Sequence, residues 1–288
     1  MAKGEWYKTT RLIETAVGIL AIENPMTIRQ LFYRLVSVGE LANSRADYQR
    51  LSVVMSKARN DDRCDFDWIV DRSRPEYSPN VWKDAAGYGR AIQRSYRKDY
   101  WATQPNHVEL WSEKDSVIGS IEALTDELGI TVRVGRGFLS TTRIHEIAHQ
   151  FLRLEKPISV FYIGDHDPSG REIEDNARNR VEEYGVDFDL VRLAIHAEDI
   201  AEWGLPPLRI KDSDTRAKQF RTQHGEDCVE LDALPVGELR RRIRGAVEGK
   251  LDRAAWDRAI AVEKIELANI QDTVGKWMNQ HPTSGNRP

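Results

Sequence analysis

Apolar residues recur at helical spacing along the first sixty residues of the chain. One stripe runs from Leu12 to Leu20 at intervals of three and four residues, which is typical of an amphipathic helix. Further on, Thr27 and Gln30 form a capping-box arrangement that predicts a helix start, and Gly39 is a suitable stop. The expected elements are helices over 9–22, 28–38 and 48–59, followed by a strand in FDWIVD at residues 66–71.

Three helices and a short β element are the ingredients of a winged-helix domain. This variant of the helix-turn-helix fold presents a helix to DNA. The same ingredients also make small packing domains without that role. We expect residues 1–104 to form a winged-helix DNA-binding domain with a linker.

After His107 the pattern changes to strands that alternate with helices. Such alternation predicts a parallel sheet, because parallel neighbours need helical crossovers, and therefore an α/β fold. We expect this second domain to span residues 105–288 and to end in a helical extension, since residues 200–277 look mainly helical. The expected strands are VELW, ITVRV, ISVFYI and FDLVRLAI, and the helices between them start near Ser116, Ser140 and Arg171.

Composition describes a globular protein with an uneven charge. Of its 288 residues 40% are hydrophobic and 31% charged, and no apolar run is long enough to span a bilayer. Residues 1–104 carry 17 Lys and Arg against 13 Asp and Glu, hence +4; the other 184 carry 25 against 33, hence −8. A basic first part could hold phosphates, and an acidic second part could hold cations. The N-terminus lacks a signal-peptide pattern and two distant cysteines form no CxxC pair, so we expect a cytoplasmic protein.

Three carboxylates follow two of the predicted strands. Glu113 comes directly after VELW, and Asp165 and Asp167 come directly after ISVFYI. Ligands of parallel sheets bind beyond the carboxyl ends of the strands, and residues two apart in an extended segment point the same way. Hard oxygen donors without a nearby Cys suit Mg²⁺. We therefore predict a magnesium site, against the alternative of a solvated acidic turn or helix cap.

The ordered motifs of residues 107–250 resemble the A subunit of topoisomerase VI and its meiotic double-strand-break relatives. WSEKDSVIGSIEAL is similar to the Glu-Lys strand end of that family's Toprim domain, and IGDHDPSGREI to its DxDPxG signature. GRGFLSTTRIHEIAHQF, GLPPLRIKDSDTRAKQF and VELDALPVGELRRRI resemble further family segments. The resemblance implies a winged-helix domain followed by a Rossmann-like Toprim domain.

The same family attacks DNA with a tyrosine that follows an arginine on the winged-helix domain. RQLFY places Arg29 and Tyr33 at the matching positions, although the first aromatic of the motif is Phe32 where the family usually has Tyr. Four residues apart on one helix, Arg29 and Tyr33 share a face and can reach one phosphate. Arg29 can favour the phenolate and stabilise charge in the transition state. The alternative is that Tyr33 is an ordinary core aromatic.

The resemblance implies partners as well as chemistry. It implies type IIB topoisomerase-like cleavage of double-stranded DNA through a 5′-phosphotyrosyl link, in a homodimer whose tyrosine from one protomer faces the metal cluster of the other. The chain has no GxxxxGK[ST] motif, so strand passage driven by ATP would require a separate B-type ATPase subunit. We expect no membrane partner and a nucleoid-associated location.

Other functions remain open from the sequence. A Toprim nuclease that uses activated water, with Tyr33 structural, and a DNA-binding module without catalysis are two of them. HEIAH matches the zinc-peptidase motif through His145, Glu146 and His149, with Glu172 or Glu174 as the obvious third ligand. The mixed basic and aromatic segment GYGRAIQRSYRKDYW indicates either a nucleic-acid contact or a solvated helix, whereas a solvated face is the simpler interpretation of LRRRIRG.

Overall fold

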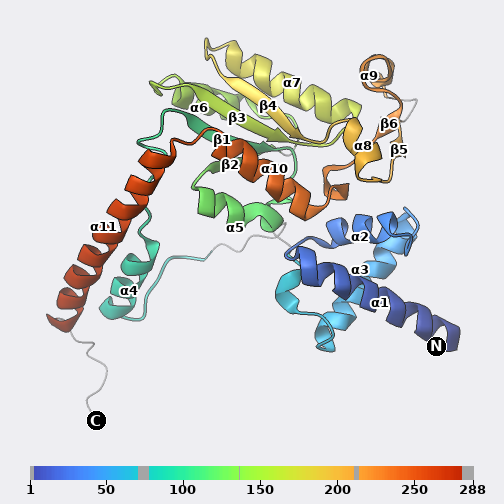
Figure 1. Ribbon diagram of the computed structural model, residues 1–288, viewed down its shortest axis with the longest axis horizontal. Coiled ribbons are helices and arrows are strands. Elements are labelled where there is room, and N and C mark those ends of the chain that lie inside the picture. Colours follow the sequence, from blue (N-terminus) through green and yellow to red (C-terminus); the bar gives the residue numbers. More distant parts are fainter. Residues whose placement is uncertain (1–2, 71–77, 136, 211–213, 281–288) are drawn as a thin grey trace. The chain divides into compact units, whose positions relative to one another are not determined.

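The computed structural model describes residues 3–70, 78–135, 137–210 and 214–280 (Figure 1). Packing divides the chain into two compact units. The first unit combines Met1–Arg74 with His107–Lys250, and the second combines Pro75–Asn106 with Leu251–Pro288. Each unit is continuous in space but not in sequence. The predicted domain boundary between residues 104 and 105 stays a prediction.

Three packed helices open the first unit. They are α1 (Lys3–Glu23), α2 (Ile28–Ser37) and α3 (Arg45–Asn60). The capping box at the start of α2 is confirmed, because the Thr27 side chain accepts from the Gln30 N–H and the Gln30 side chain accepts from the Thr27 N–H. The apolar faces of the three helices pack on one another, so that Leu20, Leu31 and Leu51 are buried.

The strand predicted in FDWIVD is wrong. Phe66–Trp68 form a short 3-10 helix, η1, and Ile69 makes a single β-bridge to Met26. The Asp65 side chain accepts from the N–H of Asp67, and such a local bond turns the backbone away from the extended conformation. The last residue of the segment, Asp71, lies outside the described residues.

A four-stranded parallel sheet follows, as the alternating pattern predicts. The strand order is β2-β1-β3-β4, and all three strand pairs are parallel. The elements are β1 (His107–Ser112), α5 (Ile118–Leu128), β2 (Thr131–Val134), α6 (Thr141–Phe151), β3 (Ile158–Ile163), α7 (Pro168–Glu182) and β4 (Asp189–Ala194). The prediction of an α/β fold is confirmed.

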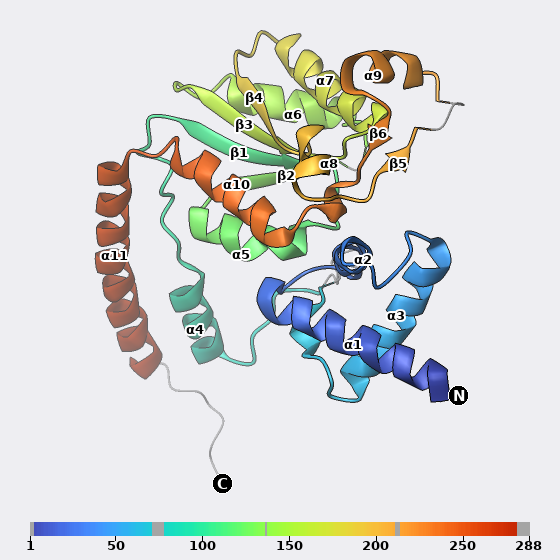
Figure 2. The same cartoon turned by 45° about the vertical axis from the view of Figure 1, so that its right-hand side comes forward.

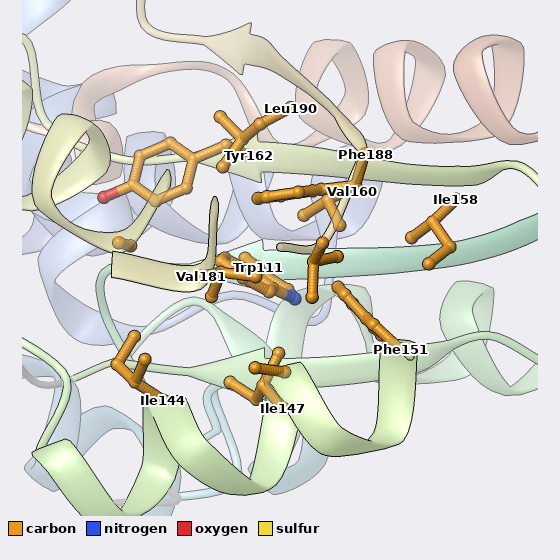
Figure 3. Packing of buried hydrophobic residues seen from close by; sticks show 13 residues of the cluster. Trp111, Ile144, Ile147, Phe151, Ile158, Val160, Tyr162, Val181, Phe188 and Leu190 are labelled. Atoms are coloured by element: carbon orange, nitrogen blue, oxygen red, sulfur yellow. The ribbon is translucent and has the colours of Figure 1, made fainter. Parts of the chain in front are cut away.

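Helices cover both faces of this sheet. In both ribbon views α6 and α7 lie on one face, and α5 lies on the other with α10 (Val236–Glu248) (Figures 1 and 2). On the first face Trp111 and Val160 pack against Ile147 and Phe151 of α6 and Val181 of α7 (Figure 3). Burial on both faces explains why ISVFYI is apolar at nearly every position.

The chain between β4 and the end of α10 is helical and irregular, as expected, and includes a small antiparallel pair that no pattern predicted. Its elements are α8 (Glu198–Glu202), β5 (Leu208–Arg209), α9 (Ala217–His224), β6 (Asp227–Cys228) and η2 (Leu231–Ala233). η2 packs against α2 within the first unit.

The second unit pairs α4 (Ala85–Ser95) with the long α11 (Arg253–Gln280). A Cβ on Gly89 of α4 would lie 2.7 Å from Sδ of Met278, so the two helices approach closely at that point. In the described ranges we find no helix with the length and apolar character that crossing a membrane would require.

Candidate active site

The predicted metal ligands follow the carboxyl ends of β1 and β3. These strands are neighbours, and the helices that follow them, α5 and α7, lie on opposite faces of the sheet (Figures 1 and 2). In parallel sheets ligands bind where the chain leaves two neighbouring strands toward opposite faces. The N–H of Glu113 donates to the carbonyl of Ile163, the last residue of β3, at 3.0 Å. The topology therefore brings Glu113 and Asp165 to this switch point.

The loop after β3 is packed closely around Glu113. A Cβ on Gly170 would lie 2.6 Å from the carbonyl oxygen of Asp165 and 3.0 Å from Oε2 of Glu113. A Cβ on Gly164 would lie 2.8 Å from the same Oε2. From β4 the buried Arg192 donates to the carbonyls of Gly164 and Asp165 at 3.0 and 3.2 Å. The glycines and the guanidinium thus fix the path of the loop.

The three predicted carboxylates lie close together. Oε2 of Glu113 accepts from the N–H of Asp165 at 2.9 Å. Oδ1 of Asp167 accepts from the N–H of Gly170 at 2.7 Å and caps α7, so the helix-cap interpretation also holds for this residue. Burial, together with the charges of Asp165 and Asp167, raises the pKa of Glu113 to about 7. Their negative charges therefore act on one another.

His166 points away from these carboxylates, as the extended spacing predicts. Its side chain is fully buried and its ring packs against Phe220 at 5.1 Å and His224 at 5.7 Å between centroids. Burial lowers the pKa of His166 to about 4, and the charge of Arg171 adds to that shift. His166 is therefore a neutral core residue at neutral pH.

Sequence reasoning missed a lysine and two further carboxylates at this edge. Nζ of Lys114 lies 2.8 Å from Oδ1 of Asp165, and 3.3 Å from both Oε2 of Glu230 and Oδ2 of Asp232. Burial alone would lower the pKa of Lys114, but the charges of Asp165, Asp232 and Glu230 raise it. Lys114 is a fixed cation among carboxylates.

Backbone pairing brings Glu230 and Asp232 to the loop. His166 and Val229 form an antiparallel bridge, with N···O distances of 2.8 and 2.9 Å. The N–H of Leu231 then donates to Oδ1 of Asp165 at 2.7 Å. The signal for this pair was in the sequence, because Glu230 and Asp232 have the same two-residue spacing as Asp165 and Asp167.

The charge of this edge fits a divalent cation. The described ionisable groups around it include the carboxylates Glu113, Asp165, Asp167, Glu230 and Asp232 and the cations Lys114, Arg29 and Arg192, so the carboxylates outnumber the cations. Among the described side chains of His, Cys, Asp and Glu, no set of three is arranged as a ready metal cage. Mg²⁺ does not require one, since it commonly keeps several waters and takes one or two carboxylates with substrate phosphate. The donor set is compatible with Mg²⁺ held in that way.

The predicted nucleophile lies on α2. Tyr33 is only 5% exposed, and its ring contacts that of Phe32 at 5.4 Å between centroids. Cζ of Arg29 lies 5.9 Å from the centre of the Tyr33 ring. Burial raises the pKa of the Tyr33 hydroxyl to about 12, and the charge of Glu230 adds to the rise, whereas Arg29 and Lys114 oppose it. The hydroxyl is therefore protonated at neutral pH in this conformation.

A pocket of about 250 Å³ adjoins Tyr33. It lies between α2 and the start of α3, and it offers two guanidinium groups, two phenols and the N-terminal end of a 16-residue helix. Helix N-termini and arginines both favour anions. The lining residues are Arg29, Phe32, Tyr33, Asn43, Ser44, Arg45 and Tyr48.

Glu230 connects the two groups of predicted site residues. Its carboxylate pairs with the Arg29 guanidinium, with 2.7 Å between Nε and Oε2, and with Nζ of Lys114. Asp232 lies 3.8 Å from Nε of Arg29. Arg29 is thus held in an acidic environment, and Tyr33 lies close enough to Lys114 for the lysine charge to lower the pKa of the Tyr33 hydroxyl. Both groups belong to the first unit of one chain.

The HEIAH segment forms part of α6, and its surroundings differ from those of a zinc-peptidase site. His145 and His149 are exposed, with ring centroids 4.1 Å apart, and Glu146 pairs with Arg143. Both possible third ligands have other partners: Glu174 is buried against Arg192 at 2.7 Å, and Glu172 pairs with Arg216. The geometry therefore disfavours a zinc peptidase.

Comparison with known proteins does not identify a family for this chain. The chain matches no known protein-family model and no curated protein. What the chain offers as evidence of function is therefore the carboxylate edge of its sheet, the Arg29 and Tyr33 pair on α2, and the ion pairs that link them.

Proposed function

We propose that this protein cleaves double-stranded DNA by tyrosyl transesterification, as a relative of the topoisomerase VI A subunit with a winged-helix and a Toprim region. The observation that carries the proposal is the link through Glu230, which joins the Arg29 and Tyr33 helix to the carboxylates after β1 and β3. Both ends of this link lie in segments of the sequence, RQLFY and the two strand ends, that resemble motifs of that family.

In the proposed reaction, Oη of Tyr33 attacks the phosphorus of a phosphodiester. The Oη–P bond forms and the P–O3′ bond breaks, while the phenol proton leaves Oη and the 3′ oxygen gains a proton. The products are a 5′-phosphotyrosyl link and a free 3′-hydroxyl. Arg29 stabilises the charge that develops on the phosphorane oxygens, and the pocket between α2 and α3 holds a neighbouring phosphate.

We propose Mg²⁺ as the cofactor, with Glu113, Asp165 and Asp167 as its ligands. When bound there, Mg²⁺ would polarise the phosphate and stabilise the leaving oxygen. Lys114 orients Asp165 through its 2.8 Å ion pair, and its charge opposes the rise that burial causes in the pKa of Asp165. The closely packed glycines and Arg192 keep the loop in place.

The structure has Arg29 engaged by Glu230 and Tyr33 protonated. A DNA phosphate must therefore compete with the Glu230 carboxylate for the Arg29 guanidinium before attack. The free protein is a resting form in this proposal, and DNA binding releases the arginine.

A metal-dependent nuclease that uses activated water is the second candidate. One observation favours it: Tyr33 is buried and its pKa lies near 12, as for a core tyrosine. In that reaction the carboxylate edge would suffice, and Tyr33 would only pack. A DNA-binding module without catalysis and a zinc peptidase rank below both.

The proposal includes partners and a location. We propose duplex DNA as substrate, a homodimer with two composite sites, and a separate B-type ATPase subunit wherever strand passage is required. Cleavage of chromosomal DNA would place the protein in the cytoplasm, at the nucleoid.

Transfer of label from DNA to protein tests the proposal. Labelled supercoiled DNA is incubated with Mg²⁺ and the protein, quenched with denaturant and examined for labelled protein. We compare wild type with Tyr33→Phe and with Tyr184→Phe, a control that removes an exposed hydroxyl outside the candidate site. We expect label on wild type and Tyr184→Phe alone. Cleavage by all three without label would establish the nuclease, and no cleavage by any would exclude both reactions for the chain alone.

A further inference from the structure

The outward face of α4, in the second unit, is basic and aromatic. Residues 81–98 carry five Lys and Arg against one Asp. Lys83, Arg90 and Arg94 are exposed, and within the described residues they have no carboxylate partner. The single Asp84 accepts from the N–H of Gly87 at 2.7 Å as the N-cap of the helix. The face therefore keeps a net positive charge.

Two aromatic rings lie at the N-terminal end of this face. Trp82 is 47% exposed and Tyr88 46%, and their ring centroids are 4.7 Å apart in an edge-to-face arrangement. A Cβ on Gly87 would lie 3.6 Å from Cβ of Trp82 and 3.7 Å from a terminal nitrogen of Arg90. Asp84, Trp82 and Arg90 therefore lie close together around Gly87.

The opposite face of α4 is occupied by α11, so the basic face is the one that stays free to bind a partner. Gly89 packs against Met278, and the Gln93 side chain donates to the carbonyl of Gln271 at 3.3 Å. Beyond the helix, Nζ of Lys98 lies 3.1 Å from Glu266 of α11. These contacts fix which side chains of α4 point outward.

The arginines of α10 show that charge alone does not make such a face. Arg241 pairs with Glu238, and Arg244 pairs with Glu127. Arg242 pairs with Asp199, and Arg240 donates to the carbonyls of Ser120 and Pro25. These four arginines are therefore engaged in contacts within the protein, whereas the sequence pattern favoured a solvated face. The cations of α4 are not consumed in this way.

We propose that the outward face of α4 is a second DNA-binding surface, in which Lys83, Arg90 and Arg94 contact backbone phosphates and Trp82 and Tyr88 pack on a sugar or an unpaired base. Unpaired cations complement a phosphate backbone, and exposed rings beside them stack on bases without sequence preference. The inference rests on the proposed function, because it takes DNA as the substrate. It adds a contact outside the unit that contains the candidate active site.

The salt dependence of DNA binding tests this surface. Each phosphate contact contributes about 0.9 to the slope of log affinity against log salt. The double variant Arg90→Gln/Arg94→Gln should make this slope shallower by about 1.8. Between 50 and 200 mM salt, the loss of affinity by the variant should then be smaller than the loss by wild type by a factor of about twelve. The matched control is Arg241→Gln/Arg244→Gln, which removes the same charge from α10 and should leave the slope unchanged.

The aromatic pair needs a second probe. We compare binding to a blunt duplex and to a duplex of equal phosphate count with a single-stranded tail. Trp82→Ala should reduce any preference for the tailed DNA while leaving the salt slope at its wild-type value. Circular dichroism confirms that each variant keeps its helices.

The outcomes separate this inference from the proposed function. An equal slope for the α4 and α10 variants, or no DNA binding by wild type, overturns the surface. A reduced slope in the α4 variant without covalent label on wild type keeps the surface and overturns transesterification. Covalent label on wild type, together with equal slopes for the two variants, supports transesterification and overturns the surface.

Discussion

The carboxylate edge of the sheet and the tyrosine helix α2 are held in place in different ways. Backbone bonds and close packing fix the edge: the β1 and β3 pairing, the bridge between His166 and Val229, and glycines with no room for a Cβ. The Arg29 side chain on α2 is held instead by ion pairs with Glu230 and Asp232. Ion pairs of partly exposed side chains contribute little stability and are screened by salt. The edge is therefore built rigid, whereas Arg29 can be released.

The largest expected effect concerns whether the two regions act within one chain or across a dimer. Tyr33→Phe and Asp167→Asn should each lose detectable DNA cleavage, since one removes the proposed nucleophile and the other a proposed metal ligand. Asparagine preserves the cap of α7. If Tyr33 of one protomer serves the cluster of its partner, a refolded mixture of the two variants regains one site per mixed dimer and nicks one strand. The measurement is nicking of supercoiled DNA.

The same mixture would give no nicking if each site is built within one chain. A site built within each chain, as the proximity of Tyr33, Lys114 and Glu230 permits, leaves every mixed dimer with two defective sites. Silence from the mixture, with mixed dimers verified by differently tagged chains, would refute the shared site. Mixing of either variant with wild type is the positive control.

The rigid edge can be broken by one methyl group. In Gly170→Ala the new Cβ would lie 2.6 Å from the carbonyl oxygen of Asp165 and 3.0 Å from Glu113. We expect a loss of about 1–3 kcal/mol in the free energy of unfolding, as for overpacked cores, together with loss of cleavage. Urea unfolding measures the first effect.

Gly237→Ala is the control for that substitution. Gly237 lies in α10, and a Cβ there would meet no atom within 4 Å. Alanine should be neutral or stabilise the helix by about 0.5–1 kcal/mol. Equal stability of the two variants would mean that the loop after β3 adjusts freely, contrary to a rigid edge.

The link itself is weakened by Glu230→Gln. Loss of this charge removes a cause of the raised pKa of Tyr33 and frees Arg29, so the pKa should fall from about 12. At neutral pH each unit of fall increases the phenolate fraction about tenfold. We expect faster covalent attachment near pH 7 and a pH profile shifted to lower pH. Glu127→Gln, at the exposed Arg244 pair, should leave the profile unchanged; the same profile in both variants would exclude Glu230 as a restraint on Tyr33.

The smallest expected effect is on stability at high pH. The pKa of Tyr33 in the folded protein is near 12, above its ordinary value of 10, so the folded state binds this proton more tightly than the unfolded state. The resulting stabilisation is complete below pH 10 and is lost as the pH rises toward 12. Wild type should therefore lose more stability than Tyr33→Phe between pH 9 and 11.5 in urea unfolding. Parallel losses would place the Tyr33 hydroxyl in a solvated environment.

Much of the fold followed from short-range patterns, and the main error arose where two local signals compete. The capping box of α2 and the parallel sheet were predicted because cap residues and alternating elements act within a few residues of one another. FDWIVD alternates well enough for a strand, but Asp65 caps a 3-10 turn inside it. A strand forms over the 3-10 turn only where the segment has a partner strand to pair with. Among the described residues of this segment, only Ile69 pairs, in a single bridge to Met26.

The sequence by itself determined the chemistry that is available at the candidate site. Glu113, Asp165 and Asp167 follow strands, and strand ends of a parallel sheet meet at one edge; Arg29 and Tyr33 share a helix face. Only the tertiary structure decided that Lys114, Glu230 and Asp232 join them, that Arg29 is engaged in the free protein and that the pKa of Tyr33 lies near 12. These properties depend on burial and on Coulomb interactions between residues up to 201 positions apart. Such interactions depend on distance in space, which no local pattern encodes.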